Sequence, residues 1–90
     1  MSTSYIAIQQ YWWCNEKGNG VVYTTDGVEF DKRDMAIKHG LEIQGSDDFN
    51  IGVIEDGRLV SLDWMNEPVG ESVETLAEIA EAIGYEGAAQ

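Results

Sequence analysis

Residues 47–67, DDFNIGVIEDGRLVSLDWMNE, predict a β-hairpin that carries an unusual amount of negative charge. Residues 49–55 and 58–64 have the apolar pattern and the β-branched side chains that are typical of strands. The dipeptide Asp56-Gly57 between them is a strong signal for a two-residue turn. Trp64 closes the second strand, and we expect it in the core. Six carboxylates and one arginine lie in this stretch, so the hairpin has little with which to neutralise its own charge.

Further strands are predicted near the N-terminus. Residues 4–13 and 21–25 are rich in β-branched and aromatic side chains. Residues 14–20, CNEKGNG, predict a turn between these two segments, and Asn19-Gly20 within them is a hairpin signal. Residues 28–30 predict a third, short strand. The first part of the chain therefore has the same hairpin character as the stretch at its centre.

Two helices are predicted, one after each group of strands. Residues 31–40 form the first, which we expect to end at Gly40, so that residues 41–44 are extended. The second covers residues 72–84 and begins at Ser72, whose hydroxyl can cap the free backbone N–H groups. Its apolar side chains recur with helical spacing on one face, at Leu76, Ile79, Ala80 and Ile83.

These elements predict a single α+β domain that spans residues 1–90, in the order ββ(β)α–ββ(β)α. Hairpins favour antiparallel pairing, and a chain of this length has room for one layer of helices. We therefore expect a single antiparallel β-sheet with the two α-helices packed on one face.

The charge of the chain is strongly acidic and unevenly distributed. Seventeen acidic and five basic residues give a formal net charge of −12, and Arg58 is the one base in residues 41–90. Nucleic acids and anionic membranes attract proteins mainly through Lys and Arg. We therefore expect no direct binding to nucleic acid or to a membrane, and we expect the partner to be a basic protein surface.

The acidic residues of the second half form the predicted partner-binding face. In the last helix, acids recur every three or four residues, so they share the face opposite the apolar side chains. The predicted partner-binding carboxylates are Glu42, Asp47, Asp48, Glu55, Asp56, Asp63, Glu71, Glu74, Glu78 and Glu81. Two other interpretations are open: a solvated helix face, or a general acidity that serves solubility.

Two aromatic residues, Tyr11 and Trp13, are predicted to add an apolar anchor to this face. Neighbouring residues of a strand point to opposite sides of a sheet. Ile6 and Ile8 indicate the core side, and Trp12 shares their parity. Tyr11 and Trp13 then lie on the open side, where exposed aromatic residues favour binding. The alternative is a bulge or a covering loop that buries them.

No pattern in the sequence indicates catalysis, a metal or a cofactor. Cys14 and His39 are the single cysteine and the single histidine, and their spacing does not predict a nucleophile and its base. Residues 46–57 lack the alternating ligands of a calcium-binding loop, and cysteine and histidine are too few for a zinc site. We expect a non-catalytic protein, a monomer or a small homo-oligomer. Its lone thiol is typical of the cytoplasm.

In size, α+β layout, lack of a catalytic motif and acidic second half, the chain resembles the anti-CRISPR proteins, especially those that act as DNA mimics. The resemblance implies an inhibitor from a phage or mobile element. Its acidic face would occupy a basic, nucleic-acid-binding surface of a Cas subunit or a host nuclease. Toxin-neutralising immunity proteins are similar in the same respects, and an acidic accessory domain without an inhibitory role is a further alternative.

Overall fold

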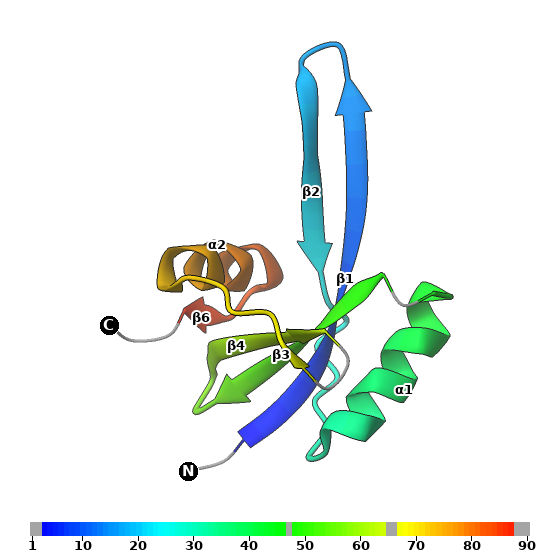
Figure 1. Cartoon of the computed structure of the whole chain (residues 1–90). Helices are drawn as coiled ribbons and strands as arrows, with labels where there is room; N and C mark the ends of the chain where they lie inside the picture. The colour runs from blue at the N-terminus through cyan, green and yellow to red at the C-terminus, as the bar shows by residue number, and fades with distance from the viewer. Residues whose placement is uncertain (1–2, 47, 65–66, 88–90) are drawn as a thin grey trace.

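The computed structural model describes residues 3–46, 48–64 and 67–87. Two strands precede the first helix, three strands lie between the helices, and a short strand follows the second helix; Figure 1 shows their arrangement. The elements are β1 (Thr3–Asn15), β2 (Gly18–Thr24), α1 (Arg33–Gln44), β3 (Phe49–Glu55), β4 (Arg58–Trp64), β5 (Glu67–Pro68), α2 (Val73–Ile83) and β6 (Glu86–Gly87). In these ranges no helix is long and apolar enough to cross a membrane.

The strands form one sheet in the order β2-β1-β3-β4-β5, in which every neighbouring pair is antiparallel. The short strand β6 pairs with β4 in the parallel direction. The predicted α+β class is therefore confirmed, and the predicted antiparallel sheet is confirmed in outline, since β6 makes the sheet mixed. Residues 28–30 do not form the expected strand; Phe30 instead makes an isolated bridge to Tyr5.

The central hairpin has the strands and the turn that its sequence predicts. β3 and β4 occupy residues 49–55 and 58–64, and Asp56 and Gly57 join them with φ of 52° and 79°. A left-handed conformation at both turn residues is typical of the two-residue turn whose twist matches that of the flanking strands. Trp64, expected in the core, is 49% exposed, because it lies beyond the last pair between β3 and β4.

The two helices lie on opposite faces of the sheet, so the expectation of both helices on one face is wrong. Ile6 and Ile8 pack with Leu76 and Ile79 of α2. On the other face, one cluster combines Ala36 of α1 with Phe49 and Ile51 of β3, and Figure 1 shows the helices on either side of β1. The strands have apolar residues at both parities, and such strands need cover on both faces.

Helix α1 continues beyond Gly40, and the predicted extended segment at residues 41–44 is helical. Gly40 is buried inside the helix, where a Cβ atom would collide with the ring of Phe49. This glycine therefore allows the helix to pack closely on β3. The helix ends instead at Gly45, whose φ of 77° suits a residue without a side chain.

Helix α2 begins and ends where its sequence predicts. The Ser72 hydroxyl accepts a hydrogen bond from the Thr75 backbone N–H at 3.2 Å, and Gly84 ends the helix with φ of 86°. Leu76, Ile79 and Ala80 are buried against the sheet. Local capping signals and a regular apolar face were therefore sufficient to predict the bounds and the buried face of α2.

Candidate protein-interaction surface

The β1–β2 hairpin extends past the rest of the sheet as a two-stranded arm, here defined as residues 10–23 (Figure 1). β3 pairs with β1 only from Thr3 to Gln9, whereas β2 pairs with β1 from Gln9 to Asn15. Two strands alone are marginally stable in water. The order of the arm therefore depends on its continuity with the sheet through β1 and on contacts at its base.

The turn of the arm falls at Glu16 and Lys17, inside the predicted turn segment 14–20 but not at its Asn19-Gly20 signal. Asn15 pairs with Gly18, and the Asn15 side chain accepts a hydrogen bond from the Lys17 backbone N–H at 2.8 Å. In the described structure, Glu16 and Lys17 are the charged residues of the arm, so its net charge is zero. The arm therefore differs in character from the acidic remainder of the chain.

Aromatic side chains are exposed on both faces of the arm. Tyr11, Trp12 and Trp13 are 49%, 74% and 43% exposed. Tyr11 and Trp13, the predicted anchors, are thus accessible to a partner. Trp12, predicted on the core side, is the most exposed of the three, because the buried part of β1 ends at Ile8. Parity places Trp12 on the α2 face as predicted, but its side chain is not covered there.

Trp13 lies against the opposite strand. It pairs with Gly20, and a Cβ atom on Gly20 would be 2.8 Å from the indole Nε1 of Trp13. The ring therefore covers backbone that Gly20 leaves open, a contact that pins the register of a hairpin. Val22, opposite Tyr11, is also exposed and extends the same apolar surface.

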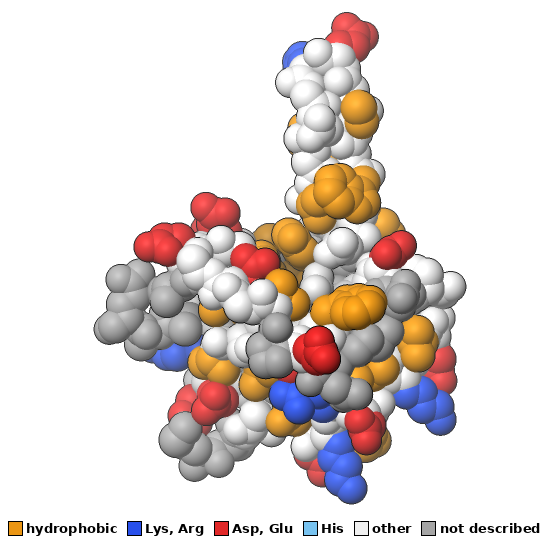
Figure 2. Space-filling view, viewed as in Figure 1, with side chains coloured by type: hydrophobic (Ala, Val, Ile, Leu, Met, Phe, Trp, Pro, Cys, Tyr) orange, Lys and Arg blue, Asp and Glu red, His pale blue; other side chains and the backbone are white. Residues whose placement is uncertain are grey.

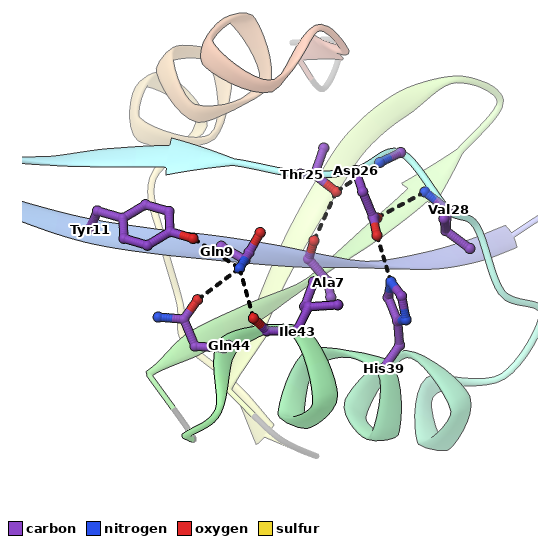
Figure 3. Close-up of polar contacts among 10 residues, drawn as sticks. Ala7, Gln9, Tyr11, Thr25, Asp26, Val28, His39, Ile43 and Gln44 are labelled. Carbon is purple, nitrogen blue, oxygen red and sulfur yellow. Dashed lines mark hydrogen bonds and ion pairs between the residues drawn. The ribbon is translucent and has the colours of Figure 1, made fainter.

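Amide side chains hold the base of the arm to α1 and β3, and Figure 3 shows the contacts with α1. The Gln9 amide donates to the Tyr11 hydroxyl at 3.0 Å and to the Gln44 side chain at 3.2 Å. Asn50 of β3 donates to the Gln10 side chain at 2.8 Å. These hydrogen bonds fix the direction in which the arm leaves the sheet, so its aromatic residues are presented in a defined orientation.

The chain that follows the arm is held by a second set of contacts, also in Figure 3. The Thr25 hydroxyl donates to the Ala7 carbonyl at 2.8 Å, and the Asp26 carboxylate lies 2.6 Å from His39 Nε2. Burial favours the neutral acid and is the largest single effect on Asp26. The hydrogen bonds from His39 and from the Val28 backbone N–H outweigh it together, so the pKa of Asp26 lies below its ordinary value.

The outer face of α2 carries three exposed carboxylates, Glu74, Glu78 and Glu81. Figure 2 shows acidic side chains over this helix and apolar side chains on the lower half of the arm. Among the described residues, no Lys or Arg forms an ion pair with any of the three. The predicted row of helix acids is therefore present and not neutralised by the protein itself.

The other predicted partner-binding carboxylates do not extend this row into one face. Glu42 lies on α1, across the sheet from α2, and Glu71 precedes the cap of α2 instead of lying on the helix. The remaining exposed or half-exposed acids lie at the β3–β4 turn and before β3: Glu55, Asp56 and Asp48. Asp47 falls outside the described residues.

Asp63 is not part of an exposed surface, so its predicted place in the acidic face is wrong. Its carboxylate is 1% exposed and accepts a hydrogen bond from Arg33 Nε at 2.6 Å and from the Ser61 hydroxyl at 3.4 Å. The Arg33 guanidinium also lies 5.1 Å from the centre of the Tyr5 ring. A buried carboxylate needs such a partner, and this one joins α1 to β4.

An open groove of about 440 Å³ separates the arm from α2. One wall is the strand edge at Val21, Val22 and Tyr23. The other wall is formed by residues of α2: Thr75, Glu78, Ile79 and Ala82. Sequence reasoning missed this groove, because it identified each wall separately and could not place β2 beside α2.

Nothing in the described residues groups three or more His, Cys, Asp or Glu side chains as metal ligands. Cys14 is exposed near the tip of the arm, opposite Asn19. His39 lies on α1 and contacts Asp26 and Phe30, which precede that helix. The structure therefore does not join the single cysteine and the single histidine into one site.

Comparison of the chain with protein-family models, with curated proteins and with solved structures found no match.

Proposed function

We propose that the protein is a non-catalytic inhibitor that binds a basic, nucleic-acid-binding surface of a nuclease or of a CRISPR-Cas complex. The observation that carries the proposal is the outer face of α2, where Glu74, Glu78 and Glu81 are exposed without a cation beside them in the described structure. Like charges on one face destabilise a protein slightly. A basic partner converts that cost into attraction.

The spacing of these carboxylates suits a surface that normally holds phosphates. At a rise of about 1.5 Å per residue, Glu74, Glu78 and Glu81 follow one another at roughly 6 and 4.5 Å along the helix axis. Phosphates of one DNA strand follow at about 3.4 Å along the duplex axis. The two rows are of the same order, so Lys and Arg placed for phosphates can also meet this helix.

The arm contributes a different kind of contact. Exposed Trp and Tyr are the residues that most often dominate the affinity of protein interfaces. Trp12, Trp13 and Tyr11 offer such anchors on a neutral ribbon beside the acidic helix. We infer that the acidic face speeds the encounter with the basic partner and that the aromatic residues slow its dissociation.

The test is competition with nucleic acid, with net charge held constant between variants. DNA binding by purified nucleases and CRISPR effector complexes is measured with and without the protein at two salt concentrations. One variant reverses Glu74, Glu78 and Glu81 to Lys. A matched control reverses three exposed acids that lie outside α2 and outside the predicted partner-binding set, at Asp31, Asp34 and Glu67. Both variants have a net charge of −6, since each reversal adds two positive charges to −12.

The proposal requires that the native protein displaces DNA, that salt weakens this displacement, and that the α2 variant loses it while the control retains it. Equal loss in both variants would show that only net charge matters. If saturating protein leaves DNA binding unchanged in every complex and nuclease tested, occlusion of a nucleic-acid-binding surface is not its function.

A further inference from the structure

The groove between the arm and α2 combines an apolar floor with a single charge. Val21 and Val22 line it from β2, and Ile79 and Ala82 line it from α2. Glu78 is the one charged residue among the described residues that line it, whereas Glu74 and Glu81 lie on the same helix outside it. The three carboxylates of α2 are therefore not equivalent.

The strand edge gives this groove a further property. β2 is the outer strand of the sheet, and three consecutive residues of it, Val21 to Tyr23, line the groove. Side chains alternate between faces, so three in succession show that the edge of the strand, not one face, forms the wall. An edge strand presents backbone N–H and C=O groups to whatever enters.

We infer that this groove binds an Arg or Lys side chain from the basic partner, an inference that rests on the proposed function. Its aliphatic stem lies over Val21, Ile79 and Ala82, and its charged end meets Glu78. Long cationic side chains bury their methylene groups on apolar surface and keep the charge in a polar setting.

Other occupants fit the groove less well. An acidic group is repelled by Glu78, and a short neutral donor can bond to its carboxylate but leaves the apolar floor uncovered. A purely apolar side chain would place its surface against that carboxylate and strip away its water. A second copy of this chain would bring another net charge of −12 close to α2. The charge and the apolar floor together select a long, cationic side chain.

The inference is tested with two short peptides, Ac-Gly-Gly-Arg-Gly-Gly-amide and the same peptide with citrulline in place of Arg. Citrulline has nearly the same shape as Arg but no charge. Binding at low salt is followed by amide and methyl chemical shifts in NMR spectra of the full chain. We expect the Arg peptide to shift signals of Val21, Val22, Ile79 and Ala82, and the citrulline peptide to shift them far less.

Three variants separate the groove from general electrostatic attraction. Glu78→Gln should weaken binding of the Arg peptide about three- to fivefold, as expected for an exposed ion pair, whereas the matched control Glu81→Gln should change it less than twofold. Ala82→Leu leaves the charge unchanged, is compatible with the helix, and should weaken binding by filling the groove.

Three results would overturn the inference: no shift with the Arg peptide, shifts spread evenly over α2, or equal effects of Glu78→Gln and Glu81→Gln. Its failure is distinguishable from failure of the proposed function. The triple reversal on α2 tests competition with DNA whether or not the groove binds a cationic side chain. The peptide titration tests the groove whether or not the protein competes with DNA.

Discussion

Arg33 Nε lies 2.6 Å from the Asp63 carboxylate, and this ion pair joins the first residue of α1 to strand β4. Asp63 is almost fully buried, whereas about a third of the Arg33 side chain is exposed. The pair explains how a carboxylate can be buried in a protein that already has a net charge of −12. It also means that the two partners are not equally dispensable.

Replacement of Arg33 by Met should destabilise the protein more than replacement of Asp63 by Asn. Arg33→Met leaves a buried carboxylate without a cation, which we expect to lower the free energy of unfolding by about 2–4 kcal/mol. Asp63→Asn leaves an arginine that can turn to water, so we expect about half that loss. Urea denaturation of both variants measures the difference.

The double variant serves as the control for this prediction. If the ion pair is the source of both losses, Arg33→Met combined with Asp63→Asn should be less destabilised than the sum of the single variants. Additive losses would show that the two side chains act independently.

Gly40→Ala should destabilise the protein although alanine is the better helix former. The added methyl group collides with the Phe49 ring, and forced overpacking of a core costs typically about 1–3 kcal/mol. This exceeds the gain of about 1 kcal/mol in helix propensity. Thermal denaturation measures the change, with Lys38→Ala, an exposed position on the same helix, as the control.

A second-site change checks the cause of the Gly40→Ala effect. Phe49→Leu removes the ring and should make Gly40→Ala neutral or stabilising in that background. A loss of the same size with Leu at position 49 would contradict the proposed collision.

The Asp26–His39 contact should make a small, pH-dependent contribution to stability. The pKa of Asp26 is lowered from its ordinary value of 3.8, so the ionised form stabilises the folded state. This stabilisation is present at pH values well above 3.8 and is lost as the pH falls through 3.8 and the lowered pKa. The native protein should therefore lose more stability between pH 5 and pH 2 than Asp26→Asn does.

Melting temperatures across this pH range measure the effect, and Asp31→Asn is a suitable control because Asp31 is exposed. Parallel pH profiles for the native protein and Asp26→Asn would show that the contact adds nothing to the acid sensitivity.

Trp12 and Trp13 should respond differently to truncation. Trp12 is three-quarters exposed, so Trp12→Ala should change the free energy of unfolding by less than about 0.5 kcal/mol. Trp13 covers Gly20, so Trp13→Ala should loosen the arm. Hydrogen exchange of the arm amides distinguishes the two variants: we expect faster exchange in Trp13→Ala only. Equal exchange rates in both would contradict the role of the Trp13–Gly20 contact.

The parts of the fold that local signals determine were predictable from the sequence. The β3–β4 hairpin and α2 have the expected bounds, since a two-residue turn at Asp56-Gly57 and a Ser72 cap depend on neighbouring residues alone. The exposed acids of α2 follow from the same helical periodicity. Local signals were less precise where a segment holds several glycines. Helix α1 ends at Gly45 and not at Gly40, and the turn of the arm falls at Glu16-Lys17, within the predicted segment 14–20 but not at its Asn19-Gly20 signal.

The sequence by itself determined the composition of the protein's surfaces: a net charge of −12, an acidic helix and an aromatic first strand. Only the tertiary structure decided how they are placed. It put the helices on opposite faces, buried Asp63 beside Arg33, and left Trp12 exposed where the core ends. It also brought β2 beside α2 to form the groove. These outcomes depend on which segments cover which face, and that is set by packing between residues far apart in the chain, which no local pattern encodes.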